Sequence, residues 1–150
     1  MTITVYGNPA PQGSKKFLGV RGGKGILVES SKAVKPWREA VKFAGLEAMD
    51  EGALSIGRHC NGAMPGAVSV RMIFTLPKPK SAPKSRRTWP DRKPDLSKLV
   101  RSTEDALTDA GVWEDDARVV LCVASKCYPG EGTDALHIPG VVIHIEQVKE

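Results

Sequence analysis

The sequence predicts an α+β fold, in which a mixed β-sheet packs against two main helices. Runs of β-branched and aromatic residues mark the strands, and two segments with apolar residues at helical spacing mark the helices. In chain order the segments read strand, strand, helix, strand, helix, strand, strand, which suits an α+β domain. A chain of 150 residues has the size of one domain, so residues 1–150 are expected to form a single domain.

The first strand is expected at "ITVYG", residues 3–7. The segment after it, "NPAPQGSKKFLGVRGGKG", is rich in proline and glycine and is expected to be a loop. This loop carries Lys15 and Lys16 and no acidic residue. A short strand at "ILVES" would then complete a hairpin.

The first helix is expected to begin near Lys32, directly after two serines that can cap it. Its buried stripe consists of four residues at helical spacing, Trp37, Val41, Ala44 and Ala48. From residue 50 to residue 65 the helical pattern gives way to a glycine-rich loop. The next strand is "AVSVRMIFTL", residues 67–76.

Residues 77–94, "PKPKSAPKSRRTWPDRKP", form a segment of different composition. It holds seven basic residues and one acid, and its five prolines exclude a helix or a central strand. We therefore expect a mobile, extended basic arm that suits a polyanion such as DNA. The DNA-binding candidates are Lys84, Arg86 and Arg87 on this arm, Lys15 and Lys16 on the N-terminal loop, and Lys98 beyond the arm.

The second helix follows the arm. Its apolar face comprises Leu99, Thr103, Ala106, Leu107 and Ala110, and a glycine at position 111 stands where a helix C-terminal cap belongs. Two further strands are expected at "ARVVLCVASKCY" and "GVVIHIEQV".

Carboxylates stand at both ends of this helix. Asp95 precedes it, where an aspartate can simply cap the helix, and Glu114, Asp115 and Asp116 follow it in a turn, where acids are usually solvated. The helix between them is about 20 Å long, so the spacing alone leaves open whether Asp95 and Asp116 meet.

The segment "PDLSKLVRSTEDALTDAGVWEDDARVV" resembles the signature of the RusA-type Holliday junction resolvases, the crossover junction endodeoxyribonucleases. That signature reads D-L-D-N-L-x-K, then D-A-L, then G, a hydrophobic pair and D-D-x-Q-V. The segments "VYGNPAPQGSK" and "VESSKAVKPWREAV" are similar to the N-terminal parts of phage members of that family. Most of the chain is covered, apart from residues 50–66.

The resemblance implies a homodimeric endonuclease that cuts four-way DNA junctions symmetrically with Mg²⁺, or with Mn²⁺ as an alternative ion. It implies that aspartates cluster around the metal. On this chain they are Asp95 and Asp116, with Asp115 as an auxiliary ligand or orienting group. Arg101 takes the place of the family lysine and would stabilise transition-state charge.

The chain departs from the signature at Ser97, where the family has the second aspartate of D-L-D. A neutral hydroxyl is a poor ligand for a hard cation, so this change is expected to weaken metal binding and slow cleavage. Alternatively, Ser97 is only the N-cap of the helix, as its residue type and position allow. Three hypotheses follow: an active junction endonuclease, a junction-binding protein with impaired cleavage, and a generic basic nucleic-acid-binding domain.

Nothing in the sequence predicts a membrane protein. No apolar run approaches the roughly 18–20 residues that cross a bilayer, and the N-terminus does not have the pattern of a signal peptide. A cytoplasmic location is expected, in a bacterial host cell, and the resemblance suggests a phage or prophage origin.

Overall fold

The computed structural model describes residues 1–13, 15–22, 24–29, 32–56 and 63–149. In the described part, two α-helices, one short 3₁₀ helix and six strands follow each other along the chain. They are β1 (Thr2–Tyr6), β2 (Lys15–Arg21), β3 (Lys24–Glu29), α1 (Val34–Ile56), β4 (Val68–Thr75), α2 (Leu96–Asp109), η1 (Asp116–Arg118), β5 (Val119–Cys127) and β6 (Gly140–Gln147).

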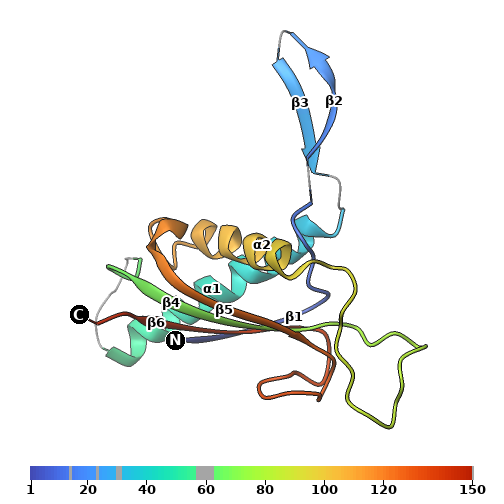
Figure 1. The fold of residues 1–150 in the computed structure, drawn as a ribbon. Coiled ribbons are helices and arrows are strands. Elements are labelled where there is room, and N and C mark those ends of the chain that lie inside the picture. The colour runs from blue at the N-terminus through green and yellow to red at the C-terminus, as the bar shows by residue number, and fades with distance from the viewer. Residues whose placement is uncertain (14, 23, 30–31, 57–62, 150) are drawn as a thin grey trace.

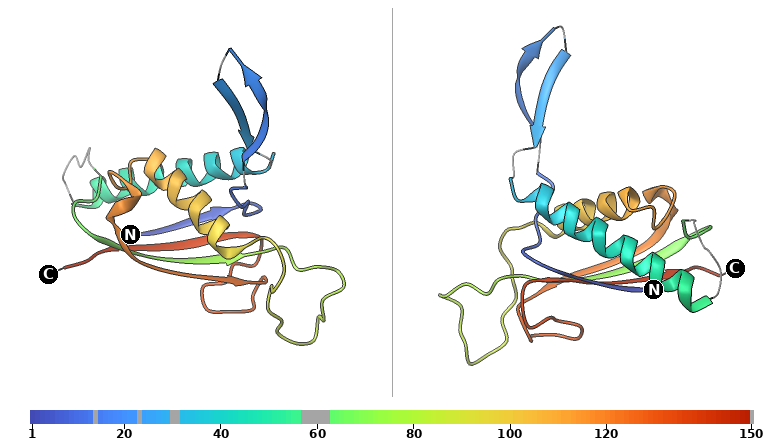
Figure 2. Two further views of the ribbon diagram at one scale, coloured as in Figure 1. Left: turned by 45° about the horizontal axis from the view of Figure 1, so that its top comes forward. Right: turned by 180° about the vertical axis from the view of Figure 1, so that it is seen from behind.

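Four of these strands form the main sheet, in the order β1-β6-β4-β5. The sheet is mixed, because β4 pairs with β5 in parallel while the β1–β6 and β4–β6 pairs are antiparallel. Both helices lie on one face of this sheet, with α2 on the side of β5 (Figure 1, Figure 2). The predicted α+β class, a mixed sheet with two helices against it, is confirmed.

The core lies between the sheet and the two helices. Alternate residues of β4, Val70, Met72 and Phe74, are buried, as a strand under helices requires. From α1, Trp37 and Val41 are buried, and the two alanines that continue the predicted stripe pack against the same core. The helices approach closely where they cross, since a Cβ built on Gly45 would lie 3.1 Å from the Cβ of Ala110.

Two expectations for the first third of the chain were wrong. The expected loop contains a strand, β2, which pairs with β3 as a separate antiparallel hairpin that projects from the body (Figure 1). Pairing with β3 and the turn at Gly22, with φ of 60°, outweigh the glycine content. In addition, α1 continues to Ile56, because the glutamate, alanine and leucine after residue 50 favour a helix.

The second helix agrees with its prediction. Its expected apolar face is buried throughout, at Leu99, Thr103, Ala106, Leu107 and Ala110. The helix ends in a Schellman motif: Gly111 has φ of 76° and donates to the Thr108 carbonyl, and Val112 donates to the Leu107 carbonyl.

Residues 77–94 contain no helix or strand, as their prolines predict. The base of this arm is attached to the loop between β5 and β6. Lys78 forms an ion pair with Glu131, and the Thr88 backbone N–H donates to the other oxygen of the same carboxylate at 3.0 Å. Together these contacts lower the pKa of Glu131, with the Lys78 hydrogen bond as the main cause. The mobility of the arm stays a prediction.

Candidate metal and DNA-binding site

Asp95 occupies the N-cap position of α2, but its side chain does not cap the helix. The carboxylate instead pairs with Lys98 at 3.1 Å and is half exposed to solvent. The hydrogen bond and the charge of Lys98 lower the pKa of Asp95, so the carboxylate is ionised at neutral pH. The Asp95 carboxylate is thus charged, accessible and not used in capping the helix, so it is free to bind a cation.

The next positions of the motif lie on the exposed surface of the first turns. Ser97 is the second residue of α2, so it is not the N-cap, and it is exposed. Arg101 is also exposed and forms no ion pair with any residue in the described part of the chain. Lys98 and Arg101 are therefore cations near Asp95 that an approaching phosphate could reach.

The second group of acids lies beyond the other end of α2. Asp115 caps η1, and its carboxylate accepts a hydrogen bond from the Ala117 backbone N–H at 2.8 Å. Asp116, the first residue of η1, is exposed. Glu114 forms an ion pair with Arg118 at 2.6 Å across one turn. Asp115 and Asp116 are thus adjacent and accessible.

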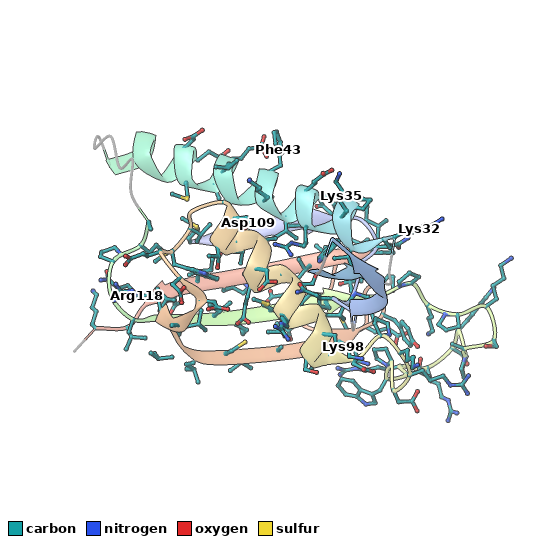
Figure 3. The ribbon with its side chains drawn as sticks, turned by 90° about the horizontal axis from the view of Figure 1, so that it is seen from above. Lys32, Lys35, Phe43, Lys98, Asp109 and Arg118 are labelled. Carbon is teal, nitrogen blue, oxygen red and sulfur yellow. The ribbon has the colours of Figure 1, made fainter. Side chains whose placement is uncertain are left out.

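Within one chain the structure does not bring Asp95 and Asp116 together. The helix between them has 14 residues, a length of about 21 Å at the helical rise per residue. It is the far end of β5 that returns to Asp95, where Lys126 donates to the carbonyls of Arg92 and Pro94 at 2.9 and 3.0 Å. In Figure 3, Lys98 and Arg118 mark the two separated ends. Accordingly, no group of three or more acids, histidines or cysteines among the described residues could hold a metal ion.

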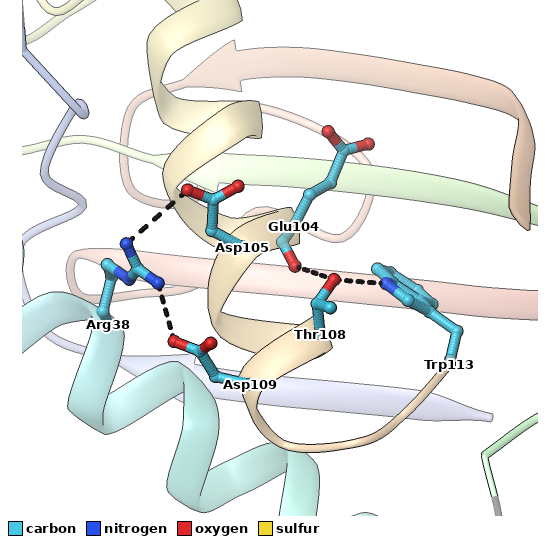
Figure 4. A network of polar contacts seen from close by, with 6 residues as sticks. All are labelled: Arg38, Glu104, Asp105, Thr108, Asp109 and Trp113. Atoms are coloured by element: carbon cyan, nitrogen blue, oxygen red, sulfur yellow. Dashed lines mark hydrogen bonds and ion pairs between the residues drawn. The ribbon is translucent and has the colours of Figure 1, made fainter. Parts of the chain in front are cut away.

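Glu104 is a further carboxylate that lies near Asp116, and it is not among the site residues predicted from the sequence. It projects from the middle of α2 on the side opposite Asp105 and Asp109 (Figure 4). Burial raises the pKa of Glu104, and the negative charge of Asp116 raises it further. The Cys122 thiol of β5 lies near it, and partial burial and the charge of this carboxylate raise the pKa of the thiol. Helical spacing could have indicated this residue, because it stands two turns after Ser97 on the same face.

Replacing Glu104 with glutamine is expected to raise the midpoint of thermal unfolding at pH 7. A carboxyl whose pKa is higher in the folded state than the ordinary 4.5 stabilises the fold below pH 4.5 and loses that contribution as the pH rises through the folded pKa. The uncharged glutamine does not lose it. The difference in unfolding midpoint between the Glu104→Gln variant and the natural chain should therefore fall to zero as the pH approaches 4. Both proteins are measured in EDTA.

A suitable control for this measurement is Glu47→Gln, at an exposed position of α1. It should leave the midpoint unchanged at both pH values, as surface substitutions usually do. Midpoints of the Glu104→Gln variant and the natural chain that stay equal from pH 4 to pH 7 would contradict the expected pH dependence.

Two other acids of α2 have a structural partner. Arg38 of α1 contacts Asp105 at 3.5 Å and Asp109 at 2.6 Å, which ties the two helices together (Figure 4). Nearby, the Trp113 indole N–H donates to the Thr108 hydroxyl at 2.7 Å. The acid of the D-A-L motif thus supports the helix pair, and both it and Asp109 lie apart from Glu104.

The basic arm presents its cations to solvent. Lys84, Arg86 and Arg87 are exposed, and the Arg87 guanidinium stacks 4.2 Å from the ring centre of Trp89, which is 63% exposed. The arm curves around an open hollow of about 490 Å³, lined by Arg86, Arg87, Arg92 and Trp89 among others. This surface combines positive charge with an accessible aromatic ring, the two features that bind phosphates and unpaired bases.

The remaining candidates lie on the projecting hairpin. Lys15 and Lys16 are the first two residues of β2, and their side chains lie outside the described part of the structure. The hairpin and the arm both extend from the end of the molecule at which α2 begins (Figure 1, Figure 2).

Within the described ranges, no helix combines the length and the apolar character that a membrane crossing requires. No curated protein matches the chain significantly. The family model described as endodeoxyribonuclease RusA matches residues 7–146, which include both ends of α2, the arm and all of the main sheet except β1 and the last residue of β6. The chain therefore belongs to the RusA endodeoxyribonuclease family, whose members resolve Holliday junctions.

Proposed function

We propose that this protein is a Mg²⁺-dependent, homodimeric endonuclease that resolves four-way DNA junctions by symmetric phosphodiester hydrolysis. The proposal rests on the family match over residues 7–146, together with the motif aspartates Asp95 and Asp116, which precede and follow α2. A cytoplasmic location in a bacterial cell and a phage or prophage origin accompany this proposal.

The residue types suit the reaction. Hard cations such as Mg²⁺ bind carboxylate oxygens, and Asp95 and Asp116 both offer exposed carboxylates, with Asp115 beside the second. Arg101, exposed in the second turn of α2, would stabilise the charge that develops on the phosphate. Asp95 precedes α2 and Asp116 follows it, however, and no group of three or more acids among the described residues of one chain could hold an ion.

The proposal is tested by incubating the protein with a synthetic four-way junction in Mg²⁺, in Mn²⁺ and in EDTA. We expect paired nicks at symmetric positions in two opposite strands with either ion and none in EDTA. A linear duplex of the same sequence serves as the control substrate. Tight binding of the junction without any nick, or equal affinity for junction and duplex, would count against the proposal.

A second candidate function rests on Ser97. The family signature has an aspartate there, whereas the serine of this chain is exposed and supplies only a neutral hydroxyl. In this alternative the protein binds junctions but cuts them slowly or not at all. The two candidates differ in the cleavage rate of the natural chain and in its response to a restored aspartate.

Removing the three arm cations, as Lys84→Ala, Arg86→Ala and Arg87→Ala together, is expected to make junction binding less sensitive to salt. Each phosphate contact contributes about 0.9 to the slope of the logarithm of the binding constant against the logarithm of salt concentration, so the slope should fall by about 3 for each arm of the dimer that contacts the DNA. Binding titrations at several salt concentrations measure it. Lys42→Ala, at an exposed site on α1, is the control and should leave the slope unchanged. An unaltered slope in the triple variant would remove the arm from the DNA interface.

A further inference from the structure

Trp89 differs from the other tryptophans of the chain, because its side chain lies largely in solvent. Trp37 and Trp113 are buried in the core at 3% and 1% exposure, whereas Trp89 on the arm is 63% exposed. An indole ring is one of the largest apolar groups in a protein, and leaving it in water forgoes the stabilisation that burial gives. The core therefore does not use Trp89, and its ring is accessible to a ligand.

The backbone on both sides of this ring is attached to the body of the protein. Before it, the Thr88 N–H donates to the Glu131 carboxylate at 3.0 Å. After it, the Arg92 carbonyl accepts a hydrogen bond from the Lys126 amine of β5 at 2.9 Å. The ring of Trp89 is thus held at a defined place although it is exposed, which reduces the entropy that a ligand must give up on binding to it.

One face of the indole already carries a cation. The Arg87 guanidinium lies 4.2 Å from the centre of the Trp89 ring, which is a cation–π distance. A Cβ built on Gly132 would lie 3.8 Å from a terminal nitrogen of Arg87, so the guanidinium also lies beside the loop that follows β5. Because Arg87 covers one face, the exposed area of the ring belongs to the other face and the edges.

The groups around this ring suit a nucleotide. Trp89 and Arg87 line two open hollows, of about 490 and 270 Å³. Arg86 and Arg92 line the larger hollow and are exposed, so they can meet the phosphates that flank a base. Asp91 lines it too, and its carboxylate can accept a hydrogen bond from an amino group of a base. An aromatic ring among cations is the arrangement that binds single-stranded nucleic acid.

This surface adjoins the end of α2 that carries Asp95. Lys126 lines the smaller hollow together with Trp89. The same lysine donates to the carbonyl of Pro94, directly before Asp95, at 3.0 Å. A nucleotide that binds at Trp89 therefore lies close to a carboxylate that we propose as a metal ligand.

We propose that Trp89 and Arg87 form a stacking site for an unpaired base of the DNA, and that this site makes the protein prefer branched DNA to duplex. The inference rests on the proposed junction binding. In a continuous duplex a base reaches such a ring only after it has been unpaired and unstacked, which costs free energy. At a branch point the continuous stack is interrupted, so a base there is released more easily. The cations of the arm, by contrast, attract any DNA.

Binding titrations in EDTA test the stacking site. Trp89→Ala is expected to weaken binding of a four-way junction by about 5- to 150-fold, the range for loss of one stacked base. The affinity for a linear duplex and the salt dependence of junction binding should stay unchanged, because the indole carries no charge that could meet a phosphate. Trp89→Phe keeps an aromatic ring and should bind the junction nearly as tightly as the natural chain.

Phe43→Ala is the matched control, because Phe43 is an aromatic residue of α1 with an exposure of 64%. It should leave the affinities for junction and duplex unchanged. Equal junction affinity of the Trp89→Ala variant and the natural chain would overturn the stacking site. An equal loss of affinity for junction and duplex would overturn it as well.

The contact itself is tested by photocrosslinking of the natural chain. 5-Iodouracil is placed at each branch-point position of the junction or, as a control, within a paired arm of the DNA, and the linked residue is identified by mass spectrometry. We expect a link to Trp89 from the branch point and none from the paired arm. Branch-point links to other residues only, or no link, would overturn the stacking site.

The outcomes for the stacking site and for the proposed function are distinguishable. A chain that cuts junctions but gives no link to Trp89 contradicts the stacking site alone. A chain that gives the link and prefers junctions but cuts with neither Mg²⁺ nor Mn²⁺ contradicts the proposed nuclease function, while the stacking site stands.

Discussion

Replacing Ser97 with aspartate is expected to accelerate junction cleavage by at least about tenfold, because loss of even an outer partner of a metal ligand costs about 10- to 100-fold. The new carboxylate would stand two residues after Asp95, on the exposed first turn of α2. It restores the charged oxygen that a hard cation prefers over a hydroxyl. A negative charge in the first turn also suits the helix dipole, so the variant should fold as well as the natural chain.

Single-turnover cleavage of a four-way junction at several Mg²⁺ concentrations measures this gain. Ser97→Asn is the matched control, since asparagine has the shape of aspartate without its charge, and it should cut no faster than the natural chain. If the aspartate variant is also no faster, Ser97 does not limit cleavage, and the hypothesis of a centre impaired at this position is wrong.

Replacing Asp116 with asparagine is expected to reduce the cleavage rate by about a hundredfold or more. Loss of a residue that only hydrogen-bonds to a metal ligand costs about 10- to 100-fold, and loss of a proposed ligand itself should cost at least as much. Junction affinity should stay the same or increase, because the substitution removes a negative charge that repels phosphates. The measurement pairs single-turnover cleavage with a binding titration in EDTA.

Glu114→Gln is the control for this experiment. Glu114 stands two residues earlier in the same acidic turn, is exposed and pairs with Arg118, so its loss removes the same charge without touching a proposed ligand. Equal cleavage by the Asp116→Asn variant and the natural chain would exclude Asp116 from the reaction.

The elements of this fold that follow from local pattern could be predicted from the sequence. The apolar spacing of α2, its terminal glycine and the β-branched runs of β4, β5 and β6 are properties of neighbouring residues, and the structure confirms them. The hairpin strand β2 was missed because its glycines suggest a loop, while pairing with β3 decides its conformation.

The candidate site was harder to predict, because it depends on contacts between distant segments. The motif identifies Asp95 and Asp116, but only the path of β5 shows that they lie at opposite ends of α2 within one chain. The proximity of Glu104 to Asp116 depends on how η1 folds back beside the helix. The arm, in contrast, could be predicted without knowledge of tertiary contacts, because five prolines and seven basic residues in one segment define it.

A junction resolvase cuts two opposite strands in a coordinated reaction, and a supercoiled plasmid with an extruded cruciform tests whether this protein does so. Two symmetric cuts during one encounter convert such a plasmid to the linear form, whereas independent nicks first give the relaxed circle. We expect linear product in Mg²⁺ from the natural chain or, if Ser97 limits the rate, from the Ser97→Asp variant. Relaxed circles as the main product of both chains, or plasmid left uncut by both, would contradict it.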